Sequence, residues 1–225
     1  MATTKNNGAL NMNESLSKSE AFFDKYRKAI IYGIIALFVI IAAVILYHNY
    51  VAVPRAEKAS TTLAKGQEYF GAGAFDKALN GDGPGFEGFL KIADDYSSTD
   101  AGNLANLYAG LCYAQLGKYQ DAAKYLENFD EKDDQMISPA AEGALGNVYA
   151  HLNQLDKAVS MLKKAASDAD NNSLSPTFLI QAGEILESQG KSSDALELYK
   201  EIKSKYPNSM QFQEIDKYIE RASQE

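Results

Sequence analysis

Side chains that could carry out acid–base, nucleophilic or metal chemistry are few and widely separated in this 225-residue chain. It contains two histidines, His48 and His151, and one cysteine, Cys112. Structural zinc sites use about four nitrogen or sulfur ligands, and a cysteine nucleophile needs a histidine close to it. One cysteine with no second histidine nearby favours neither kind of site. We therefore predict no catalytic residue, no metal and no cofactor, and we do not expect an enzyme.

The remaining candidates for chemistry have simpler structural interpretations. The carboxylates Asp94 and Asp95, and those of residues 130–134, lie where helix ends and loops are expected. A glycosidase would need paired acids across a cleft, which a helical solenoid of this size is not expected to provide. The glycines include no Gly-Lys-Ser/Thr sequence, so a phosphate-binding loop is not indicated. Cys112 is most simply a small buried residue of the core.

Residues 29–47 form the longest apolar stretch, nineteen residues without a charge, an amide or a proline. As a helix they would be ~28 Å long, close to the ~30 Å hydrocarbon core of a bilayer. Tyr32, Tyr47 and Tyr50 lie near its ends, where aromatic residues favour the headgroup region. We expect one uncleaved transmembrane helix; the alternatives are a buried core helix and a cleavable signal peptide.

Charge indicates the orientation and the class of partner. Lys25, Arg27 and Lys28 lie directly before the span, whereas the first cations after it are Arg55 and Lys58. The positive-inside rule then places the N-terminus in the cytoplasm and the rest of the chain across the membrane. The net charge is −8, with the excess of acids after the span. An acidic domain of this kind is not expected to bind nucleic acid.

A repeat dominates the chain after the span. Four small residues on predicted first helices, four turn residues and four alanines on predicted second helices recur in register: Gly66, Gly110, Gly146 and Gly183; Gly73, Gly117, Asn153 and Gly190; Ala78, Ala122, Ala158 and Ala195. The alanines are 44, 36 and 37 residues apart, near the period of about 34 residues of a tetratricopeptide repeat. Small residues allow antiparallel helices to approach closely, and glycine or asparagine suits a left-handed turn.

The predicted fold is all-α: one N-terminal transmembrane helix, an α-solenoid of about four helix pairs and a C-terminal capping helix. We expect a disordered tail over 1–19, a juxtamembrane helix and span over 20–53, repeats over 54–208 and the cap over 209–225. Residues 80–85 should interrupt the first repeat as a loop. Ser138-Pro139 and Ser175-Pro176 are predicted to start helices, with serine as the cap and proline at the first position.

First helices of such pairs line the concave side of the stack, which is where we expect a partner. The offsets that face this side give seven candidate groove residues: Leu104, Leu107, Leu111, Asn147, His151, Glu184 and Glu187. A leucine-lined groove that becomes acidic would suit an amphipathic or basic protein segment. The alternatives are that the leucines belong to the core and that His151 is an ordinary exposed helix residue. We expect no small-molecule substrate.

Two stretches resemble one protein family: residues 22–28, Phe-Phe-Asp-Lys-Tyr-Arg-Lys, before the span, and residues 89–96, Phe-Leu-Lys-Ile-Ala-Asp-Asp-Tyr, in the repeats. Together with a span followed by degenerate repeats, they are similar to the YfgM-type proteins of the bacterial inner membrane. That resemblance implies a periplasmic repeat domain that is ancillary to the SecYEG translocon and a partner of a PpiD-like chaperone.

Two functions therefore remain open at this point. The first is a membrane-tethered periplasmic interaction scaffold near the translocon and its chaperones. The second is a structural assembly factor of a cell-envelope complex that does not handle clients. Both need the tether, so the sequence does not separate them.

Overall fold

The computed structural model describes residues 7–83 and 85–224, with only the backbone for residues 7–19 and Phe23. The described residues form helices and no strand, as the all-α prediction required. The chain divides into two compact units, Met1–Pro54 and Arg55–Glu225.

The first unit consists of α1 (Asn7–Tyr47) and a π-helical turn, η1 (His48–Ala52). Among the described residues, one helix is long and apolar enough to cross a membrane, and none of its most apolar part is buried within the protein. An apolar helix of this length with exposed side chains is a candidate membrane anchor, in agreement with the stretch predicted over residues 29–47.

The tail differs from the expectation of disorder where it is described. Residues 7–19 lie in α1, while residues 1–6 are outside the described part of the chain. The tail contains no proline. Adding residues to an existing helix costs much less than nucleating one, so the apolar helix supports this extension even though the tail is polar.

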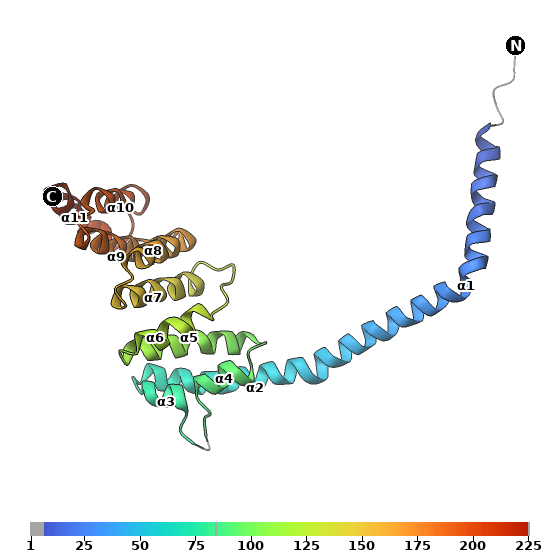
Figure 1. Cartoon of the computed structure of the whole chain (residues 1–225), viewed down its shortest axis with the longest axis horizontal. Helices are drawn as coiled ribbons and strands as arrows, with labels where there is room; N and C mark the ends of the chain where they lie inside the picture. The colour runs from blue at the N-terminus through green and yellow to red at the C-terminus, as the bar shows by residue number, and fades with distance from the viewer. Residues whose placement is uncertain (1–6, 84, 225) are drawn as a thin grey trace, which may run out of the picture. The chain divides into compact units, whose positions relative to one another are not determined.

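The second unit contains the repeats, stacked in chain order (Figure 1). Its helices are α2 (Val53–Gly71, which begins in the first unit), α3 (Phe75–Asn80), α4 (Phe89–Asp95), α5 (Asp100–Gln115), α6 (Tyr119–Glu127), α7 (Ile137–His151), α8 (Leu155–Ala169), α9 (Ser175–Ser188), α10 (Ser192–Lys205), η2 (Gln211–Gln213, a 3-10 turn) and α11 (Ile215–Gln224).

The helix pairs form for the reasons that the repeat predicted. The four turn residues Gly73, Gly117, Asn153 and Gly190 all have positive φ angles, between 57° and 72°. Close approach explains the small residues on the first helices: a β-carbon added to Gly146 would lie 2.8 Å from Cγ of Leu162. Larger residues at this position would push α7 and α8 apart.

The first repeat is interrupted, as predicted, by a loop between α3 and α4. Gly81 and Gly88 have φ angles of 89° and 87°, which side chains rarely tolerate. Two contacts with α2 hold this loop: Tyr69 Oη donates to Asp82 at 2.6 Å, and Lys65 Nζ donates to the carbonyl of Gly85 at 2.9 Å. This loop splits the second helix of the repeat into two short pieces, α3 and α4.

The last helix, α11, closes the core of the final repeat. Ile215 and Ala222 are 1% and 4% exposed and belong to the same apolar cluster as α9 and α10. Tyr218 and Ile219 pack against this cluster from the same helix. The amphipathic α11 thus shields the apolar end of the stack from water.

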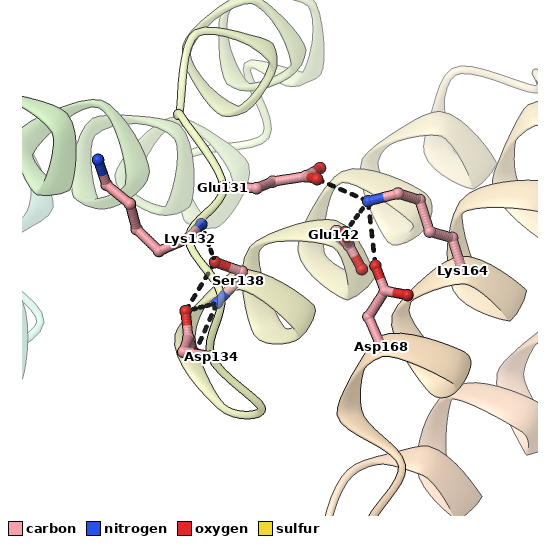
Figure 2. A network of polar contacts seen from close by, with 7 residues as sticks. All are labelled: Glu131, Lys132, Asp134, Ser138, Glu142, Lys164 and Asp168. Atoms are coloured by element: carbon pink, nitrogen blue, oxygen red, sulfur yellow. Dashed lines mark hydrogen bonds and ion pairs between the residues drawn. The ribbon is translucent and has the colours of Figure 1, made fainter. Parts of the chain in front are cut away.

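The predicted serine caps of α7 and α9 are wrong. α7 begins at Ile137 and is capped by Asp134, whose carboxylate accepts the backbone N–H of Met136 at 2.8 Å and the hydroxyl of Ser138 at 2.7 Å (Figure 2). In the turn that leads into α9, Asn171 Oδ1 accepts the N–H groups of Ser173 and Leu174, both at 2.9 Å.

The reason is that each serine already lies inside its helix, four residues after the true cap. Ser175 Oγ accepts the N–H of Asn171 at 3.0 Å. Ser138 Oγ likewise accepts the N–H of Lys132 at 2.7 Å. The two serines therefore fold the preceding loops back onto the helix starts.

Candidate partner-binding groove

An open groove lies between α7 and α9, the first helices of the third and fourth repeats. Its volume is about 580 Å³, and seven residues line it: Asn147, Ala150, His151, Gln181, Glu184, Ile185 and Ser188. Three of the predicted groove residues, Asn147, His151 and Glu184, thus come together at one place. Gln181, Ile185 and Ser188 were not predicted, although they lie on the same face of α9 as Glu184.

Helix packing fixes the polar walls of this groove. Asn147 Nδ2 donates to Gln181 Oε1 at 3.4 Å, which links α7 and α9 at the groove. The ring of His151 stacks on that of Tyr119 at the start of α6, with centroids 4.2 Å apart and an interplanar angle of 4°. His151 is therefore an exposed residue held in place by a neighbouring repeat.

The electrostatics of the groove favour a cation. Glu184 is exposed and is the negatively charged residue among those that line the groove. None of the lining residues is a lysine or an arginine. His151 and Ser188 are the last residues of α7 and α9. The carboxyl ends of both helices therefore face this region, and the helix dipole places partial negative charge there.

Polar side chains give the groove a second capability. The amides of Asn147 and Gln181 offer donors and acceptors that suit a peptide backbone. A bound carboxylate, by contrast, would find no cation among the lining residues. The groove is thus suited to an internal, positively charged peptide segment rather than to a free C-terminus.

The leucines do not form the open strip that the sequence predicted. Leu107 is 8% exposed and belongs to the core shared by the second and third repeats. Leu104 and Leu111 are half-buried and pack against the same core. Neighbouring repeats must bury apolar area where they meet, and α5 lies inside the stack, so its leucines are used for packing.

Glu187 also lies outside the groove. Its carboxylate accepts hydrogen bonds from Arg221 of α11 and from Tyr199 Oη of α10, the latter at 2.9 Å. The Arg221 hydrogen bond, aided by Tyr199, lowers the pKa of Glu187 against the opposing effect of burial. Glu187 therefore stabilises the C-terminal cap instead of facing a partner.

A second hollow, of about 390 Å³, lies among α4, α5 and α6. Its wall includes Asn103, which is 8% exposed and whose amide bonds both backbone groups of Asp130, with Nδ2 to the carbonyl at 2.8 Å and Oδ1 from the N–H at 2.7 Å. Both polar ends of Asn103 are satisfied within the protein. Its role is to hold the segment between α6 and α7.

No catalytic chemistry is indicated by the described side chains. No group of three or more histidine, cysteine, aspartate or glutamate residues there could hold a metal ion. Cys112 is completely buried, and burial raises the pKa of its thiol to about 12. The thiolate needed for nucleophilic attack is therefore negligible near neutral pH.

Fold and groove together define an α-solenoid of the tetratricopeptide type. The family model described as "Tetratricopeptide repeat-like domain" matches residues 20–217, and the chain belongs to this family. Its repeats suggest a protein-interaction scaffold, and the fold is typically non-catalytic. No curated protein sequence matches the chain.

Solved structures show the same fold. One is the crystal structure of a Podosopora anserina kinesin light chain whose TPR-like repeats are nearly identical to one another. It superposes on this chain with a TM-score of 0.58 and 13% sequence identity, and the match covers 75% of this chain and 86% of that one. The crystal structure of MamA protein gives a TM-score of 0.55 and 19% identity, covering 75% of this chain and 91% of MamA. At such identities the likeness concerns the fold alone.

Proposed function

We propose that this protein is a membrane-tethered periplasmic scaffold whose groove between α7 and α9 binds a partner protein. The observation that carries this proposal is the groove itself: an open, polar, negatively polarised surface on the first-helix face, built from two adjacent repeats. A surface of this kind offers affinity without chemistry, which is what an interaction scaffold needs.

The tether follows from α1. An uncovered apolar helix is stable in a bilayer and unstable in water, so membrane insertion is the simplest explanation of its exposure. Lys25, Arg27 and Lys28 precede the apolar part, and the repeats are more acidic. The positive-inside rule then favours a cytoplasmic N-terminus and repeats on the other side.

The partner segment is expected to be internal and basic. Glu184 and the carboxyl ends of α7 and α9 favour a lysine or arginine, while Asn147 and Gln181 can bond the segment's backbone. Opposite charge also speeds association, so binding should weaken as ionic strength rises.

The resemblance to YfgM-type proteins supports a more specific setting. In that setting the scaffold is ancillary to the SecYEG translocon, and a PpiD-like chaperone is among its partners. The alternative is an assembly factor of a cell-envelope complex that handles no clients. The identity of the crosslinked partner separates these two.

The experiment is site-specific photo-crosslinking in native membranes. A photoreactive residue replaces Ser188, which lines the groove, or Ser160, an exposed serine of α8 that does not. We expect crosslinks from position 188 to translocon or chaperone subunits and none from position 160. Equal crosslinking from both positions would refute the groove, and products containing only a stable envelope machine would favour the assembly factor.

Protease protection tests the orientation in the same membranes. Protease added after the outer membrane is opened should digest the repeats. Digestion that requires rupture of the inner membrane would reverse the orientation and remove the periplasmic proposal.

A further inference from the structure

Glu142 of α7 is a carboxylic acid buried in the repeat core. It is 3% exposed, and only one of its two oxygens is satisfied: Oε1 accepts a hydrogen bond from Lys164, whereas Oε2 is buried with no hydrogen-bond partner. A buried carboxylate oxygen without a donor is expensive, because water solvates the ionised group much better.

The repeats themselves show that packing does not require an acid at this position. Glu142 lies four residues before Gly146, and the residue four before Gly183 in the next repeat is Leu179. Leu179 is 3% exposed and packs in the apolar core. An aliphatic side chain therefore fills the equivalent space in the fourth repeat, and the carboxyl of Glu142 needs another explanation.

The surroundings of Glu142 contain more negative than positive charge. Lys164 of α8 is within 2.7 Å of Glu131 and 3.3 Å of Asp168, in addition to its contact with Glu142 (Figure 2). Three carboxylates therefore share one ammonium. Glu131 belongs to the segment between α6 and α7, so Lys164 ties both this segment and α7 to α8.

The other neighbours do not change this balance. Asp134 lies at the same end of α7, but its carboxylate is occupied by Ser138 and backbone N–H groups. α9 presents the ring of Phe178 to α7 next to Glu142. Among the described residues, the titratable groups that face Glu142 are thus Lys164 and Asp168 from α8 and Glu131 from the loop.

We propose that Glu142 and Lys164 form a proton-controlled latch between α7 and α8, closed when Glu142 is protonated and loosened when it is ionised. In the protonated state the partnerless Oε2 carries the proton, and Lys164 is neutralised by Glu131 and Asp168. In the ionised state a buried negative charge is held by a lysine that two other carboxylates already share.

The direction of the pH effect follows from the proton affinities of the closed and opened states. Burial raises the pKa of Glu142 from 4.5 to about 7 in the closed structure. Once the latch opens, water returns the group to its ordinary pKa, so the closed state binds the proton more tightly. Opening should therefore become easier as pH rises from about 5 to about 7, by up to about tenfold per unit, and then level off.

Hydrogen exchange of the full-length protein in detergent tests this proposal. The quantity measured is the protection factor of the α7 amides and the preceding loop between pH 5 and 8, corrected for the intrinsic pH dependence of exchange. In the unsubstituted protein we expect protection to fall by at least about tenfold across this range. Glu142→Gln, which keeps the shape and cannot ionise, should remove this fall.

Two further variants keep the test decisive. Glu142→Leu copies Leu179 and should also show protection that does not change with pH, even if Glu142→Gln folds poorly. Glu131→Gln removes a carboxylate from the same lysine but leaves Glu142 in place, so it should reduce the fall without abolishing it. The proposal is overturned if the unsubstituted protein shows no fall, or if both position-142 variants retain it.

Discussion

Ile215 is the residue whose truncation should most clearly expose how the C-terminal helix stabilises the stack. It is 1% exposed and packs in an apolar cluster to which α8, α9, α10 and α11 contribute. Ile215→Ala removes three buried carbon atoms, a loss of about 2.4 kcal/mol at about 0.8 kcal/mol for each. The cavity left behind adds to this loss, which gives a total of about 3–4 kcal/mol, within the range of about 2–5 found for such substitutions.

The position of Ile215 at the end of the array sets where the loss appears. The terminal helix α11 packs on the last repeat at the end of the array, so the substitution should release α11 while α7 and α8 remain folded. Hydrogen exchange should show loss of protection in α11 first, and thermal unfolding should show an earlier phase.

Ile219 is the matched control, because it is on the same helix but only partly buried against the same cluster. Ile219→Ala should cost less than half as much. Equal effects of the two substitutions, or a change of less than about 1 kcal/mol for Ile215→Ala, would show that α11 does not cap the core as described.

Two smaller predictions concern polar contacts. The hydrogen bond from Arg221 lowers the pKa of Glu187, so the stability that Glu187 provides is present above the ordinary glutamate pKa of 4.5 and is lost as pH falls below it. In hydrogen exchange followed from pH 7 to pH 3, α11 of Glu187→Gln should therefore be less protected at pH 7 and should lose less further protection in acid. A loss of protection in acid as large as that of the unsubstituted protein would contradict this. Asp134→Ala removes the cap of α7 and should lower the free energy of unfolding by about 1 kcal/mol in urea titrations, whereas the exposed Asp133 lacks such contacts and Asp133→Ala should change little.

The fold was predictable because its determinants are local and repeated. The turns are marked by Gly73, Gly117, Asn153 and Gly190, and the second helices by the alanines that follow them. The same residue pattern therefore occurs four times in one sequence. The apolar stretch of α1 is equally self-evident, because its length alone matches a bilayer.

The site was predictable only in part, since the offsets specify a helix face but not what covers it. Asn147, His151 and Glu184 do line one groove, while Leu107 is covered by the next repeat and Glu187 is occupied by Arg221. The last contact joins residues far apart in the chain, and no local pattern indicates it.

The caps and the latch were missed for a related reason. Asp134 and Asn171 each precede a Ser-Pro pair by the same interval, a signal that could have identified both caps. Glu142 offers no such signal, because its burial depends on the packing of α7 against α8.

The central claim, that the groove between α7 and α9 binds a basic partner segment, is tested most directly by charge reversal at Glu184. Crosslinking from position 188 is compared between the unsubstituted protein, Glu184→Lys and the control Glu197→Lys, which changes an exposed acid of α10 away from the groove. The account predicts a loss of about tenfold for Glu184→Lys, corresponding to about 1.4 kcal/mol, and no loss for Glu197→Lys. Undiminished crosslinking by a folded Glu184→Lys protein would contradict it.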